Sequence, residues 1–170
     1  MNEADTLQTF AEVGVALTGF TGVVVVFGRR AHGDWSPVEL ANLYDLLWAS
    51  LNVVFFAFLP LVMVSIMTAD AMWRVVSGAF ALAEILFFGH YWWRGARFFR
   101  DRVPAPTWGV RLAFIAIPLM IAAPVTKAAV ALGFWVSFAP FIYQASLFGF
   151  LLTAAVNFVF LLLPRDAGAA

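Results

Sequence analysis

The sequence contains no cysteine, and charged residues occupy only 12% of its 170 positions. Without cysteine there can be no disulfide, no thiolate metal site and no thiol nucleophile. A typical soluble domain is about 25% charged, so a share half as large indicates that much of this chain faces lipid. The formal net charge is zero, which gives no reason to expect a nucleic-acid partner.

The motifs of several enzyme classes are missing as well. The sequence has no P-loop, no Gly-x-Ser-x-Gly elbow, no His-Glu-x-x-His pair and no dinucleotide-binding fingerprint. The two histidines, His32 and His90, would have to face each other at one depth to hold a haem. Two histidines without cysteine are also a poor zinc site. We therefore predict no catalytic centre, no cofactor and no metal.

Long apolar segments fill the chain instead, since 64% of its residues are hydrophobic and 17% are aromatic. A helix that spans a bilayer needs about 20 mostly apolar residues. Five segments meet this requirement, at residues 7–27, 46–67, 71–93, 110–132 and 141–163. The sequence thus predicts an all-α, polytopic integral membrane protein, with residues 1–170 forming a single domain of five transmembrane helices.

Several residues mark where these helices begin. Ser36, Pro37 and Glu39 have the spacing of a capping box with proline at the first helical position, which predicts the start of the second helix there. Asp70 and Thr107 are the predicted caps of the third and fourth helices.

Basic residues indicate the orientation of the bundle. If five spans are threaded, eight of the ten basic residues fall on one side, namely Arg29, Arg30, Arg94, Arg97, Arg100, Arg102, Arg111 and Arg165. The positive-inside rule then places the N-terminus outside and the C-terminus in the cytoplasm, in the cell's inner (plasma) membrane. The basic and aromatic segment Arg94–Arg102 is expected to contact anionic lipid headgroups.

Small residues line one face of the first apolar segment. Gly14, Thr18 and Gly22 are spaced four apart, which is the small-xxx-small pattern of closely packed membrane helices. The pattern predicts that this face meets another helix. That helix lies either in the same chain or in a second copy, and self-association as a homo-oligomer is our expectation.

Three polar residues, Asn52, Glu84 and Asn157, fall in the inner half of separate spans. At about 1.5 Å per residue, all three lie at about 21–26 Å from the outer ends of their helices. We predict a shared polar core that opens toward the basic side, where Asp45 and Arg111 would lie. Such a core is a structural hydrogen-bond cluster, a proton or ion path, or a ligand site.

A second pair of charges is predicted near the outer boundary. Counted from Arg29 and Arg111, Glu12 and Lys127 lie at similar heights of about 26 Å and 24 Å. The sequence therefore predicts an ion pair between the first and fourth helices. The alternative is that Lys127 extends to the headgroups and Glu12 is hydrated.

These features favour a small membrane channel or transporter that moves protons, ions or a small solute through a polar path. The alternative is a non-catalytic accessory or scaffold subunit of a larger membrane complex. An accessory subunit would carry the same polar residues, but they would be dry and fully paired.

Overall fold

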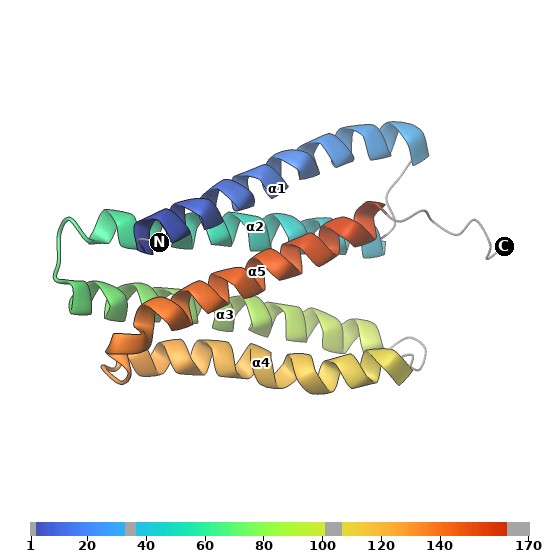
Figure 1. Ribbon diagram of the computed structural model, residues 1–170. Helices are drawn as coiled ribbons and strands as arrows, with labels where there is room; N and C mark the ends of the chain where they lie inside the picture. The colour runs from blue at the N-terminus through green and yellow to red at the C-terminus, as the bar shows by residue number, and fades with distance from the viewer. Residues whose placement is uncertain (1–2, 33–36, 101–106, 163–170) are drawn as a thin grey trace. The chain divides into compact units, whose positions relative to one another are not determined.

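The computed structural model describes residues 3–32, 37–100 and 107–162. Side chains are described throughout these ranges except at 27–32, 37–39, 91–100, 107–117, 119 and 160. The described chain is helical apart from the turns at 64–68 and 132–135, and it has no strand, which confirms the predicted all-α fold (Figure 1). Its elements are α1 (Glu3–His32), α2 (Pro37–Met63), α3 (Ala69–Arg100), α4 (Thr107–Ala131), the short 3-10 helix η1 (Val136–Phe138) and α5 (Ala139–Leu162).

Four of the helical segments are long and apolar enough to cross a membrane, which supports a multi-pass membrane protein. They are Glu3–Val26, Leu40–Met63, Ala69–His90 and Val136–Val159. In α4, the described apolar part is the shorter segment Met120–Ala131.

The helix starts agree with the sequence in one case and correct it in another. Pro37 is the first residue of α2, as predicted, whereas Ser36 lies outside the described residues. Asp70 is not the N-cap of α3, because α3 begins at Ala69. The carbonyl of Thr68 accepts the first bond, from the Met72 N–H at 2.8 Å, so Thr68 occupies the capping position. Asp70 instead places its charge in the first turn, where the helix dipole favours it.

The chain divides into two compact units, which we describe separately. The first comprises Met1–Val62 and Gln144–Ala170, and so contains α1, nearly all of α2 and most of α5. The second comprises Met63–Tyr143, and so contains α3, α4, η1 and the first turn of α5.

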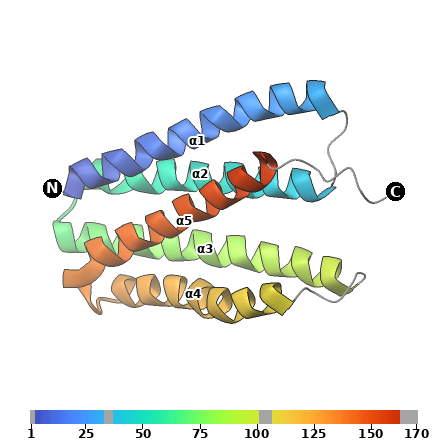
Figure 2. The same cartoon turned by 45° about the vertical axis from the view of Figure 1, so that its right-hand side comes forward.

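In the first unit, α1 approaches α2 closely at Gly14. A Cβ built on Gly14 would lie 2.9 Å from Val54 Cγ2 and 3.1 Å from the carbonyl oxygen of Ser50. Further along, α1 diverges from α2, as both views show (Figure 2). Accordingly, Gly22 is exposed, with nothing within 4 Å of its Cβ position. The small face therefore packs against α2 at one end only.

In the second unit, α3 and α4 run side by side in opposite directions (Figures 1 and 2). Gly78 permits the approach, since its Cβ would lie 3.2 Å from Ala131 Cβ. The buried side of α3 recurs at helical spacing, at Trp73, Val76, Ser77, Phe80 and Glu84.

The C-terminus of α4 is closed by hydrogen bonds and by one arginine. Gly133 N–H donates to Val130 O and Phe134 N–H donates to Ala129 O, both at 2.9 Å, which is a Schellman motif. Gly133 has φ +98°, a conformation that a residue with a side chain adopts only under strain. Arg74 Nε donates to Ala131 O at 3.1 Å, which satisfies another terminal carbonyl and fixes the end of α4 to α3.

Candidate functional site

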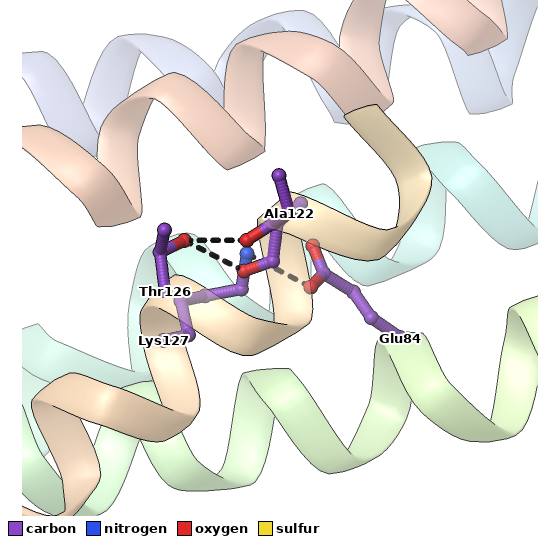
Figure 3. A network of polar contacts seen from close by, with 5 residues as sticks. Glu84, Ala122, Thr126 and Lys127 are labelled. Carbon is purple, nitrogen blue, oxygen red and sulfur yellow. Dashed lines mark hydrogen bonds and ion pairs between the residues drawn. The ribbon is translucent and has the colours of Figure 1, made fainter. Parts of the chain in front are cut away.

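The site that the structure brings together is a buried ion pair between α3 and α4. Lys127 Nζ lies 2.8 Å from Glu84 Oε2 (Figure 3). The Glu84 side chain is 1% exposed and the Lys127 side chain is 0% exposed. Two ionisable groups are therefore removed from solvent inside the apolar part of the chain.

The antiparallel arrangement explains why these two side chains meet. The Cα–Cβ bonds of a helix tilt toward its N-terminus, and long side chains continue in that direction. Glu84 therefore leans toward the start of α3, and Lys127 leans toward the start of α4. Because the two helices run in opposite directions, these leanings bring the carboxylate and the ammonium toward each other.

Aromatic rings form part of the surroundings of the pair. Lys127 Nζ lies 4.9 Å from the centroid of the Phe80 ring, a distance typical of a cation–π contact. Phe80 contacts Tyr143 edge to face with centroids 5.2 Å apart, and Tyr143 contacts Trp73 at 5.6 Å. All three rings are buried. Such walls strengthen the attraction between opposite charges, and they raise the desolvation cost of both.

The polar groups near the pair are incompletely satisfied. Glu84 Oε2 lies 2.8 Å from the ammonium but is not aligned to accept a hydrogen bond. Ser77 Oγ, two helical turns earlier on α3, is fully buried and has no hydrogen-bond partner. The neighbouring turn of α4 is better satisfied, because Thr126 Oγ1 donates to Ala122 O at 2.9 Å and to Ala123 O at 3.0 Å (Figure 3).

Lys127 is paired with Glu84, a partner that the sequence analysis did not assign to it. Glu12 is exposed and accepts a hydrogen bond from Gln8 Nε2, one turn away on α1, at 2.9 Å. The depth argument counted the rise of Cα atoms and took no account of side-chain length or direction. A lysine side chain spans several ångströms, enough to join residues whose Cα atoms differ in height.

The two predicted core asparagines bond to their own helices. Asn52 Nδ2 donates to Trp48 O at 2.8 Å, and Asn157 Nδ2 donates to Thr153 O at 3.0 Å. Each amide thus uses the carbonyl four residues earlier, the partner that a helix always supplies. Glu84 itself is paired with Lys127.

The remaining predicted residues are placed as follows. Asp45 is half-buried on α2, while the side chains of Arg111 and of 94–100 lie outside the described residues. Thr18 Oγ1 donates to Gly14 O at 2.9 Å. Within the part of the chain that the structure describes, no three His, Cys, Asp or Glu side chains lie together as metal ligands.

Sequence reasoning did not identify Phe80 and Tyr143 as neighbours of the charged pair. Phe80 does lie four residues before Glu84, so helical spacing puts it on the same face. No comparable signal marks Tyr143, whose approach depends on the connection between α4 and α5.

The structure thus combines four helical segments that are long and apolar enough to cross a membrane with a buried ion pair between two helices, α3 and α4. No protein-family model matches the chain, and no curated protein or solved structure is significantly similar to it. The functional argument therefore rests on the geometry of the site.

Proposed function

We propose that this chain is a small membrane transporter whose working ionisable centre is the Glu84–Lys127 pair. A single observation carries the proposal. A carboxylate and an ammonium lie 2.8 Å apart and almost fully buried, on helices of an apolar membrane-type bundle. Ionisable residues within membrane spans commonly mark ion pathways and proton relays.

Stability alone is a weak reason to bury such a pair. Desolvating two charges is expensive, and replacing a buried ion pair by well-packed apolar residues is often neutral or stabilising. A pair that can be opened by a proton has a use that an apolar contact lacks. When the Glu84 carboxylate takes up a proton from water, its attraction for Lys127 falls, and α3 and α4 lose the charge that holds them together.

The enclosure of the pair favours a transporter over a permanently open channel. In an aqueous pore the charged groups would be hydrated, whereas here the two side chains are 1% and 0% exposed. We take this to be a closed state, in which access to Glu84 requires movement of the surrounding helices. The transported species is a proton, an ion or a small solute coupled to one.

The same enclosure supports a second candidate, a non-catalytic accessory or scaffold subunit. Such a subunit needs polar residues that are satisfied within the chain, and Asn52 and Asn157, which bond to their own helices, fit that description. In such a subunit the Glu84–Lys127 pair would only hold α3 and α4 together, and the protein would transport no proton, ion or solute.

Proton flux into liposomes that contain the purified protein separates the two candidates. A pH-sensitive dye inside the vesicles reports flux under a potential or a pH gradient. We expect flux with the wild type and with Glu3→Gln, a matched change at an exposed carboxylate, and loss of flux with Glu84→Gln. Since Glu84→Gln leaves Lys127 unpaired, the double variant Glu84→Gln/Lys127→Gln serves as a neutral, hydrogen-bonding replacement. A wild type without flux would favour the accessory subunit, and full flux in a folded double variant would remove the pair from the mechanism.

Orientation, assembly and location belong to the same proposal. The distribution of arginines supports five spans with the N-terminus outside and the C-terminus in the cytoplasm of an inner (plasma) membrane. Reporter fusions should then read cytoplasmic at Gly33 and external at Thr68, and a cytoplasmic reading at Thr68 would contradict the orientation. The uncovered glycine face of α1 at Gly19 and Gly22 supports a homo-oligomer.

A further inference from the structure

A groove lies between α1 and α2 of the first unit, and neither residue of the ion pair lines it. Its volume is about 440 Å³, and it is open on one side. The walls are apolar and are formed by Ala11, Val15, Ala16, Phe58 and Leu61.

Two polar side chains, Gln8 and Glu12, also line this groove. Glu12 is exposed and lies nine residues into the candidate span Glu3–Val26, about 14 Å along the axis from Glu3. The Gln8 amide donates to Glu12 Oε1, but an amide cannot neutralise a carboxylate. In the described part of the chain, no cation pairs with Glu12.

Glu12 therefore gives the groove a negative charge that no cation of the described chain neutralises. A cation bound there would pair with this carboxylate, and pairing stabilises a charged side chain that lies on an apolar surface. The groove supplies the remainder of a binding site, because ligand pockets are mostly apolar with few polar groups and have volumes of roughly 300–1,000 Å³. The ring of Phe58 adds a face that attracts cations.

We infer that the groove binds a lipophilic organic cation, with Glu12 as its counter-charge and Gln8 holding the carboxylate in place. A small molecule fits better than a basic helix of a partner protein. The groove is confined to about two turns of α1, whereas a packed helix would need a surface along much of the span. This site belongs to the first unit alone, so the inference does not rest on the proposed transport function.

Binding of tetraphenylphosphonium to the purified protein in a non-ionic detergent tests the inference. The isosteric anion tetraphenylborate is the matched probe, because it has the same shape and apolar surface with the opposite charge. We expect saturable binding of the cation to the wild type, measured by equilibrium dialysis of the radiolabelled compound. Tetraphenylborate should show only non-saturable partition into the micelle.

Variants identify the residue responsible. Glu12→Gln should weaken cation binding about tenfold or more, because it removes the charge while keeping the size of the side chain. Phe58→Leu should weaken it less, and Glu3→Gln should leave it unchanged, with folding checked by thermal unfolding. Absence of saturable binding, equal binding of the anion, or undiminished binding by Glu12→Gln would each overturn the inference. A basic partner helix would then be the occupant to consider.

Discussion

The two units hold the carboxylates of their long apolar helices in opposite ways. Glu84 is 1% exposed and faces an ammonium on the adjacent helix at 2.8 Å. Glu12 is exposed and is bonded only to an amide on its own helix among the described residues. Both carboxylates lie in apolar helical segments of similar length. Their environments therefore differ because of what the neighbouring helix provides.

The contrast distinguishes a carboxylate that is neutralised within the chain from one that is accessible to a ligand. The second unit neutralises Glu84 internally, so a ligand or proton acts on it only by displacing Lys127. The first unit leaves Glu12 on an open apolar groove, where a cation can reach it without rearrangement of the helices. The Glu84–Lys127 pair is therefore suited to a protonation switch, and the groove at Glu12 is suited to reversible binding of a cation.

Breaking the Glu84–Lys127 pair should have the largest effect on the stability of the fold. Lys127→Met removes the ammonium but keeps a long apolar side chain, and it leaves Glu84 as a buried, unpaired carboxylate. We expect a loss of about 3–5 kcal/mol in the free energy of unfolding, measured by chemical denaturation in detergent.

The double variant Glu84→Leu/Lys127→Met is the control for this prediction. Because it removes both charges, it should recover most of the lost stability, and the mutant cycle then measures the coupling. If Lys127→Met alone were no more destabilising than a surface change, the buried pair would not exist in the membrane-like environment.

A smaller effect is expected where the first unit is most tightly packed. Gly14→Leu places a side chain where even a Cβ would lie 2.9 Å from Val54 and 3.1 Å from the Ser50 carbonyl oxygen. Overpacking of this kind destabilises by about 1–3 kcal/mol, which should appear as a lower melting temperature.

Gly22→Leu is the matched control, since nothing lies within 4 Å of its Cβ position. It should leave the stability of the isolated chain unchanged, and it should reduce the oligomeric fraction in size-exclusion chromatography if this face joins subunits. Equal losses of stability at Gly14 and Gly22 would show that α1 packs along its full length.

The sequence predicted the helices well because long apolar segments have few alternatives in lipid. It predicted their ends less well. The segment 71–93 marks where hydrophobicity stops, whereas α3 continues to Arg100, because a helix can extend beyond the apolar segment. Pro37 was placed correctly because proline is favoured at the first helical position and has no N–H to leave unsatisfied.

The sequence identified the two residues of the site but not their pairing. Glu84 and Lys127 were both identified as costly residues, yet each was assigned a different partner. Matching charges would have succeeded where matching depths failed, since Glu84 is the one carboxylate in the middle of a span and a buried lysine requires a carboxylate. The contact itself depends on the antiparallel pairing of α3 with α4 and on close approach at Gly78 and Ala131, which no local pattern encodes.

The smallest expected effect on stability is at Glu12. Glu12→Gln keeps the size and hydrogen-bonding capacity of an exposed side chain, and the Gln8 amide retains an oxygen acceptor at the same position. Surface changes of this kind usually fall within about 0.5 kcal/mol, so the melting temperature should stay close to that of the wild type.

Thermal unfolding with and without tetraphenylphosphonium makes the comparison sharper. The cation should raise the melting temperature of the wild type, since a ligand that binds only the folded state stabilises it, and should leave that of Glu12→Gln unchanged. If Glu12→Gln instead unfolded as readily as Lys127→Met, Glu12 would be a structural charge like Glu84, and the distinction between the two units would fail.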